Sequence, residues 1–304
     1  MSHAPRATAR AEVAWCRAVA RRWDRRGVLR LTAGGAGLAA GVAVLGACGG
    51  GGARSQLVLL PNDWDFFAGV PYRLGFFVAD NANNAAPVAL DSPLTLRIAL
   101  QGNAFGPVLD TVVHANGPEP NYALTTYTFP VPGTYNVRAS FKGHSLALPL
   151  TVTPPSASAT PTVGQHMVSV ATPTPADHRG VNPICTAQPA CPFHAVSLDA
   201  ALAAHRPVAL QFATPALCQS RFCGPVLSNL VAVSGPWRDR VAFIHSEIYT
   251  DLSGRTSTPP VTAYHLVHEP LLFLAGIDGI VKARIDNGYD RAEATSALSQ
   301  LVAS

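Results

Sequence analysis

At 304 residues the chain is longer than a typical single domain, and with 48% hydrophobic and 13% charged residues it can form sizeable buried cores. The formal net charge is +4, but residues 1–30 carry a net charge of +6, which leaves −2 for the rest of the chain. A polyanion gains little electrostatic attraction from such a main body, so binding of nucleic acid is not expected.

The N-terminal segment has the pattern of an export signal. Eight arginines in residues 1–30 are followed by Leu31–Ala47, seventeen residues without a charged side chain. A basic segment before a short apolar one predicts an export signal over residues 1–47. The apolar run is short and contains five glycines, which makes it a poor membrane-spanning helix. Arg25-Arg26 also resembles a twin-arginine export motif.

The sequence Leu45-Gly46-Ala47-Cys48 resembles the lipobox of bacterial lipoproteins, and the glycine-rich residues 48–54 are predicted to form a flexible tether. The resemblance implies that Cys48 is lipidated and that the lipid holds the exported protein on the extracytoplasmic face of the cell membrane. Cys16 leaves with the signal. The remaining cysteines form two close pairs, which outside the cytoplasm predicts disulfide chemistry: Cys185, Cys191, Cys218 and Cys223.

Residues 55–153 are predicted to be all β. Short runs rich in aromatic and β-branched residues alternate with turn clusters: Leu57–Leu60, Tyr72–Val78, Leu94–Leu100, Tyr122–Phe129, Tyr135–Phe141 and Leu146–Val152. Six or seven strands in about a hundred residues are similar to an immunoglobulin-like β-sandwich. Residues 154–176 are rich in Pro, Ser and Thr and predict an extended linker, interrupted by a short strand at His166–Val170.

From residue 177 to 304 helices and strands alternate. A helix capped by Ser197 is expected before a buried strand at Pro207–Thr214, and a second helix covers Pro225–Val233. The remaining expected elements are strands at Val241–Ile244, Pro270–Leu274 and Gly279–Ile285 and a closing amphipathic helix at Asp290–Val302. This order predicts an α/β domain with a mixed central sheet flanked by helices.

Three features of this region resemble the thioredoxin-like family. They are Phe212-Ala213-Thr214 at a strand end, the stretch from Cys218 to Pro225, and Glu269-Pro270 before a hairpin. The resemblance implies a redox-active cysteine pair, a cis bond before Pro270, and backbone groups of Glu269 that bind an incoming peptide.

The cysteine spacing departs from the family pattern Cys-x-x-Cys, because four residues separate Cys218 from Cys223. Residues five apart on a regular helix lie about 7.5 Å apart along its axis, which is too far for a disulfide. We therefore expect a loop at 215–222 and a helix from about Gly224-Pro225. The helix N-terminus and Arg221 would stabilise a thiolate. Chain order favours Cys218 as the nucleophile, whereas proximity to the helix favours Cys223.

The second pair, Cys185 and Cys191, lies in a proline-rich stretch and is predicted to form a structural disulfide. Two alternatives stay open: a relay pair that passes electrons to Cys218 and Cys223, and a zinc site with His194, for which four ligands are not visible. His265 and His268 precede Glu269 and suggest copper handling of the Sco type, but that family spaces its cysteines Cys-x-x-x-Cys. No metal or other cofactor is expected.

The sequence therefore predicts a lipid-anchored thiol–disulfide oxidoreductase that acts on extracytoplasmic protein thiols and disulfides. One alternative is a thiol peroxidase, because the Cys-x4-Cys spacing and Thr214-Pro215 resemble one group of peroxiredoxins, although Thr214 lies one residue too far from Cys218 and the family's acidic residue is replaced by Arg221. Another alternative is a surface-binding lipoprotein in which the cysteine pair is a static disulfide.

Overall fold

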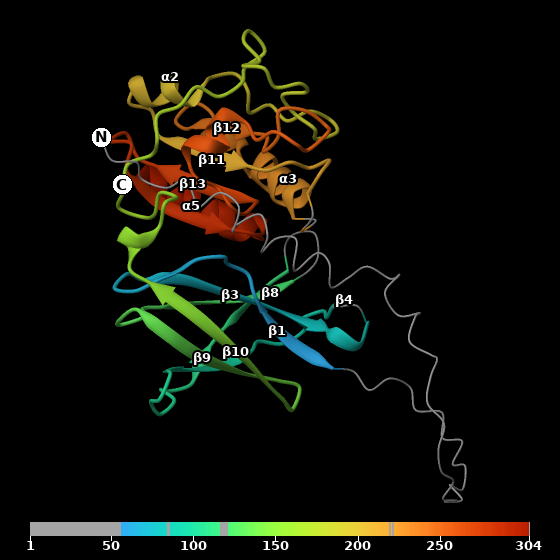
Figure 1. Ribbon diagram of the computed structural model, residues 1–304, viewed down its shortest axis with the longest axis vertical. Coiled ribbons are helices and arrows are strands. Elements are labelled where there is room, and N and C mark those ends of the chain that lie inside the picture. Colours follow the sequence, from blue (N-terminus) through green and yellow to red (C-terminus); the bar gives the residue numbers. More distant parts are fainter. Residues whose placement is uncertain (1–55, 84–85, 116–120, 219, 221, 304) are drawn as a thin grey trace, which may run out of the picture. The chain divides into compact units, whose positions relative to one another are not determined.

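A computed structural model describes residues 56–83, 86–115, 121–218, 220 and 222–303. The predicted export signal at 1–47, the predicted lipidation site Cys48 and the predicted tether at 48–54 lie outside these residues. In the described parts the chain is a mixed α/β protein, mostly strands with few helices, arranged in three sheets (Figure 1). Within the same parts, no helix combines the length and apolar character needed to cross a bilayer.

The first two sheets, each of five strands, come from residues 57–153. One sheet has the order β1-β3-β8-β7 with β4 paired to β3, and the other has the order β2-β10-β9-β5-β6. Their strands are β1 (Leu57–Pro61), β2 (Phe66–Phe67), β3 (Tyr72–Asp80), β4 (Ala86–Pro87), β5 (Thr95–Leu100), β6 (Leu109–Asp110), β7 (Val112–His114), β8 (Tyr122–Tyr127), β9 (Gly133–Phe141) and β10 (His144–Thr153).

The two sheets share one hydrophobic core. Phe76 and Val78 of β3 pack in the same cluster as Ile98 of β5 and Val137 of β9. The burial pattern of β9 alternates strictly after its first two residues, as expected for a strand with one face on a core. At the start of β9, the Tyr135 hydroxyl donates a hydrogen bond to the carbonyl of Val131 at 2.8 Å and so fixes the turn that enters the strand.

The third sheet has the order β12-β11-β13-β14. Its strands β11 (Val208–Phe212) and β12 (Ala242–Ser246) run parallel, while β13 (Leu271–Ala275) is antiparallel to β11 and β14 (Val281–Asp286). The helices are α2 (Leu198–Ala203), α3 (Cys223–Val233), α4 (Pro259–Ala263) and α5 (Arg291–Ala303), with 3-10 turns η1 (Asn81–Asn83), η2 (Pro155–Ala157) and η3 (Gly235–Trp237).

Helices cover both faces of this third sheet. Leu210 of β11 belongs to a core that includes residues of α2 and α4, whereas its neighbour Ala209 belongs to a core with α3 and α5. All five residues of β11 are buried. A strand covered on both faces has no solvent side, which explains why its sequence is a continuous apolar run rather than an alternating one.

The predicted elements are largely confirmed, and the differences have local causes. The six expected strands of 57–153 are present, but the sequence did not indicate the two- and three-residue strands, which are defined only by their partners. Ser197 is the N-cap residue of α2, yet its hydroxyl does not cap the helix; it accepts a hydrogen bond from the Thr172 amide instead. Helix α4 was not expected.

The segment predicted as a linker, 154–176, packs against the third sheet. The strand expected at His166–Val170 is wrong: only one β-bridge forms, between His166 and Ile280. Met167 is 6% exposed and belongs to the core on the α2 side, and its amide donates to the carbonyl of Gly279 at 2.8 Å. Apolar side chains within this stretch therefore hold it on the surface of the sheet. Residues Gly52–Ser304 form one compact unit, and the proposed boundaries at 153 and 177 stay a prediction.

Candidate functional site

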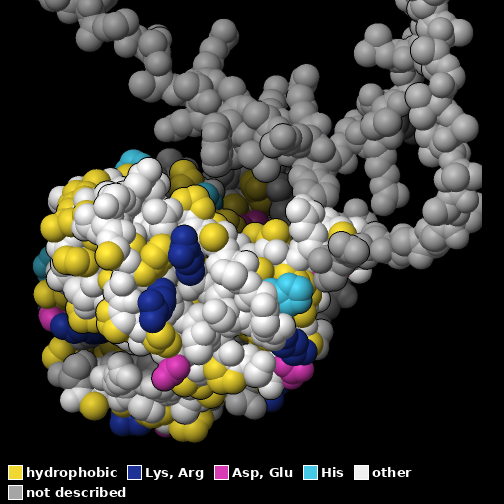
Figure 2. Space-filling model, turned by 90° about the horizontal axis from the view of Figure 1, so that it is seen from below, with side chains coloured by type: hydrophobic (Ala, Val, Ile, Leu, Met, Phe, Trp, Pro, Cys, Tyr) yellow, Lys and Arg dark blue, Asp and Glu magenta, His cyan; other side chains and the backbone are white. Residues whose placement is uncertain are grey.

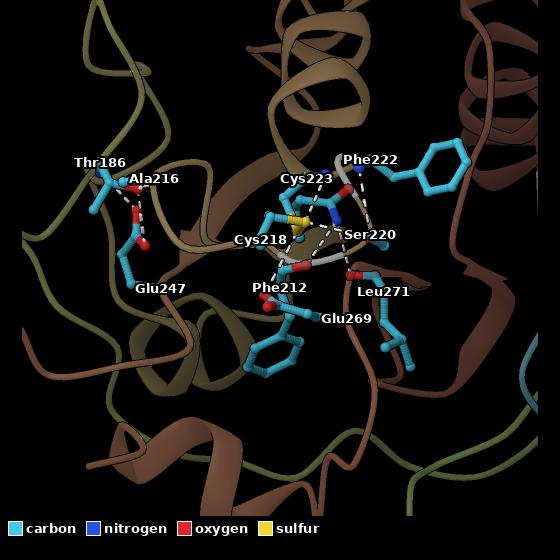
Figure 3. Close-up of a disulfide and its surroundings, with 12 residues drawn as sticks. Thr186, Phe212, Ala216, Cys218, Ser220, Phe222, Cys223, Glu247, Glu269 and Leu271 are labelled. Carbon is cyan, nitrogen blue, oxygen red and sulfur yellow. Dashed lines mark hydrogen bonds between the residues drawn. A yellow bond between two sulfur atoms is a disulfide. The ribbon is translucent and has the colours of Figure 1, made fainter. Parts of the chain in front are cut away.

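The Cys218–Cys223 pair forms a disulfide at the point where a loop enters α3 (Figure 3). The loop follows β11, and the Cα atoms of the two cysteines are 6.0 Å apart. Helix α3 begins at Cys223, close to the expected start at Gly224-Pro225. Because only Cys223 lies on the helix, the two cysteines are close enough to form a disulfide, as the sequence predicts.

The two sulfur atoms differ in accessibility. Cys223 is fully buried, whereas Cys218 is partly exposed. The Sγ atom of Cys218 accepts the backbone N–H of Cys223 at 3.3 Å and lies 3.3 Å from the Ser220 hydroxyl. These donors would stabilise negative charge on Cys218 after reduction. Arg221, which the sequence suggested for the same purpose, lies outside the described residues.

The carboxyl group of Glu269 lies beside the buried cysteine. Its Oε2 atom is 3.6 Å from Sγ of Cys223. Burial raises the pKa of Glu269 from 4.5 to about 7, with a further contribution from the negative charge of Glu247. The sequence predicted Glu269 for its backbone groups; the side-chain contact with Cys223 was missed. The bond between Glu269 and Pro270 is cis, as the family resemblance implied.

A short hydrogen-bond chain connects the cysteine loop with the preceding proline-rich stretch (Figure 3). The amide of Ala216 donates to the Thr186 hydroxyl at 3.1 Å, and that hydroxyl donates to Glu247 at 3.2 Å. The Thr186 amide donates to the same carboxylate at 2.6 Å. Glu247 is 2% exposed, so this buried carboxylate orders both segments.

Thr186 directly follows Cys185, whose predicted bond to Cys191 is not present in the structure. Both cysteines are free thiols. The physical reason is that two histidines share their space: Sγ of Cys191 lies 3.4 Å from Nε2 of His194 and 3.4 Å from Nδ1 of His245. Sγ of Cys185 lies 3.7 Å from the same Nδ1 atom. Each sulfur atom contacts an imidazole nitrogen, and the two sulfurs interact through a hydrogen bond rather than a covalent bond.

Three groups in this cluster have a shifted pKa, and that of Cys191 is raised by its hydrogen bond with Cys185 and by burial. Hydrogen bonds from Cys191, His194 and His245 lower the pKa of Cys185. Burial lowers the pKa of His245, but the hydrogen bond with Cys185 and the charge of Glu247 outweigh it, so the pKa is raised overall. The cluster thus favours a thiolate on at least one sulfur.

The histidines suggested for copper lie elsewhere. The ring of His268 stacks on Trp64 with a centroid distance of 4.7 Å, and His265 is exposed. Among the residues that the structure describes, the groups with metal-binding geometry are Cys185–Cys191–His194–His245 and Cys218–Cys223–Glu269, and neither group includes these two histidines.

Comparisons with known proteins do not assign the chain. No protein-family model matches it, and no curated protein is found to be similar.

Proposed function

We propose that this protein is a thiol–disulfide oxidoreductase that uses Cys218 and Cys223. The observation that carries the proposal is the asymmetry of the pair: a partly exposed sulfur at a helix N-terminus is bonded to a buried sulfur beside a carboxyl group with a raised pKa. This combination provides one sulfur for attack, one leaving group and one proton carrier.

The resemblance to the thioredoxin-like family gains support from the third sheet. Parallel β11 and β12, antiparallel β13 and β14, and helices on both faces are the arrangement that the resemblance implies. The two sheets of residues 57–153, with their shared core and the Tyr135 hydrogen bond, likewise support the immunoglobulin-like sandwich. Both family assignments are part of the proposal.

The reaction follows from the positions of the sulfur atoms. A substrate thiolate attacks Sγ of Cys218, the Cys218–Cys223 bond breaks, and Cys223 leaves as a thiolate that takes the proton of Glu269. A second substrate thiolate then attacks the substrate sulfur of the mixed disulfide and releases Cys218 as a thiolate. Two electrons have passed from the substrate dithiol to the protein disulfide, and a substrate disulfide has formed. The same steps in reverse reduce a substrate disulfide, with Glu269 accepting the proton of Cys223.

A specific observation favours this exchange over the peroxidase alternative. The hydroxyl of Thr214 is buried and has no hydrogen-bond partner among the residues that the structure describes. It therefore does not hydrogen-bond to Cys218, whose described partners are Ser220 and the amide of Cys223. The peroxidase alternative rests on Thr214-Pro215, and the Thr214 hydroxyl does not supply the contact with the attacking sulfur that this alternative requires.

The proposed location is the extracytoplasmic face of the cell membrane, with a lipid on Cys48 as the anchor and protein thiols or disulfides as partners. On the face drawn in Figure 2, basic and acidic side chains are scattered among apolar and neutral ones. This mixture suits contact with polypeptides better than contact with a polyanion.

The test uses two matched variants in the full chain. Cys223→Ala keeps the backbone N–H that stabilises Cys218 and removes the resolving thiol, so it should accumulate mixed disulfides with substrate proteins. Cys218→Ala leaves only the buried sulfur and should trap none. Non-reducing gels of membrane fractions, followed by mass identification of the adducts, give the readout. Adducts only in Cys218→Ala would reverse the two roles. A static disulfide would be supported if neither variant forms an adduct and millimolar dithiol does not reduce the Cys218–Cys223 bond of the unsubstituted protein.

A further inference from the structure

The second cysteine pair belongs to a four-residue cluster with the composition of a metal site. Cys185 and Cys191 come from the proline-rich stretch before α2, His194 follows three residues later, and His245 lies on β12. One ligand atom from each residue lies within 4.8 Å of all the others. The sequence alone offered three of these residues; the fold supplies His245 from 51 residues further along the chain.

Four of the six separations between the ligand atoms are close to those of a tetrahedral zinc site. With bonds of about 2.3 Å to sulfur and about 2.0 Å to nitrogen, tetrahedral ligands lie about 3.5 Å apart for a sulfur–nitrogen pair and about 3.3 Å apart for two nitrogens. The three measured sulfur–nitrogen distances are 3.7, 3.4 and 3.4 Å. The two nitrogens, Nδ1 of His245 and Nε2 of His194, are 3.3 Å apart.

Hydrogen bonds orient His245 and the backbone next to Cys185. Nε2 of His245 lies 3.0 Å from the carbonyl of Ala213, which can only accept, so in the neutral imidazole Nε2 keeps its proton and the lone pair of Nδ1 is directed at the sulfurs. Glu247 accepts the amide of Thr186 and thereby fixes the backbone next to Cys185. His245 is fully buried and His194 is 6% exposed, so both imidazoles lie inside the fold, while the two cysteines are half-buried.

We propose that Cys185, Cys191, His194 and His245 bind one Zn²⁺ ion in a closed, structural site. Two thiolates and two neutral imidazoles balance the charge of the ion, and the two thiol protons pass to solvent on binding. Four protein ligands leave no open position for a substrate, so the ion stabilises structure rather than taking part in catalysis. It fastens residues 185–194 to β12. This proposal is independent of the oxidoreductase activity, because no ligand belongs to the Cys218–Cys223 pair.

The experiment measures metal in the full chain carrying Cys16→Ser and Cys48→Ser, so that only the two pairs of cysteines remain. We expect one zinc per chain by elemental analysis after purification with Zn²⁺. Replacement by Co²⁺ should give the visible bands of a tetrahedral site and a sulfur-to-cobalt charge-transfer band. The variant Cys191→Ser or His245→Gln should weaken binding by more than about 100-fold, beyond the usual effect of residues that only orient ligands.

Two controls separate this site from other sources of metal. His178→Gln changes an exposed histidine in the same stretch of chain and should keep one zinc and the full cobalt spectrum. Cys218→Ser with Cys223→Ser should also keep both, because it removes the other cysteine-containing group with metal-binding geometry. Loss of the cobalt bands in this double variant would overturn the proposal.

A measurement on the protein with all four ligands present covers the case in which a ligand variant does not fold. Zn²⁺ should protect Cys185 and Cys191 from alkylation, as mapped by peptide mass, and a chelator should remove the protection. Absence of bound zinc together with a Cys185–Cys191 disulfide in the unreduced protein would overturn the proposal and restore the structural disulfide. A site that takes Cu(I) but not Zn²⁺ would overturn the choice of metal.

Discussion

The carboxyl group of Glu269 gives a quantitative prediction about stability and pH. Its pKa is about 7 in the folded protein against an ordinary value of 4.5, mainly because of burial. Between these two pH values the folded protein holds a proton that the unfolded chain releases. The stabilising contribution is therefore full below pH 4.5, decreases as the pH rises, and is lost above about pH 7. A pKa difference of this size corresponds to about 3 kcal/mol.

The variant Glu269→Gln keeps the shape of the side chain and removes the titration. The difference in unfolding free energy between Glu269→Gln and the unsubstituted protein should change by about 3 kcal/mol from pH 4.5 to above 7, with the variant gaining relative stability as pH rises. Urea denaturation at several pH values, under conditions that keep the disulfide intact, measures this difference.

Comparing the two proteins removes the contribution of other groups. Burial also raises the pKa of Asp63 to about 7, but Asp63 titrates in both proteins and cancels from the difference. Asp239→Asn, at an exposed position, is the matched control and should give a difference that does not vary with pH. If the Glu269→Gln difference is equally flat, Glu269 titrates normally and is not the proton carrier for Cys223.

Three further predictions concern the rest of the chain. Arg73→Ala should lower the unfolding free energy by about 3–5 kcal/mol, because it leaves the carboxylates of Asp63 and Glu293 without their cation. The control Arg97→Ala, at an exposed position, should change it by less than about 0.5 kcal/mol, and equal effects would contradict the pairing. Leu210→Ala should cost about 3 kcal/mol in the same denaturation assay and Ile277→Ala, whose side chain is exposed, much less; a small loss at Leu210 would mean that the core collapses around the gap. Cys48→Ala should abolish lipidation, seen as a lost mass increment and release from membranes, and unchanged retention would argue against a lipoprotein.

The two cysteine sites are connected through the backbone. His245 contacts the carbonyl of Ala213, and Thr186 binds the amide of Ala216; both alanines lie between β11 and Cys218. The proposed zinc ion would thus hold the segment against which the cysteine loop is ordered. Its removal should increase hydrogen exchange of the Ala216 amide before it affects the sheets.

Local patterns determined much of this protein. The strands of 57–153, the continuous apolar run of β11 and the helix after the cysteine loop follow from hydrophobic periodicity and residue type, which act over a few neighbouring positions. The spacing of Cys218 and Cys223 also required a loop before the helix, because a regular helix separates such residues too far to bond.

Tertiary structure decided what depends on distant parts of the chain. The sequence could not show that the side chain of Glu269 lies against Cys223, because the two residues are 46 positions apart and meet only when β13 pairs with β11. The sequence predicted a disulfide between Cys185 and Cys191 because it could not show that His245 lies beside them. His245 reaches the two cysteines only through the parallel pairing of β12 with β11. Burial then sets the chemistry of both sites, since the pKa of a carboxyl group or thiol depends on the solvent and charges around it. The local sequence specifies neither the burial of these groups nor the charges around them.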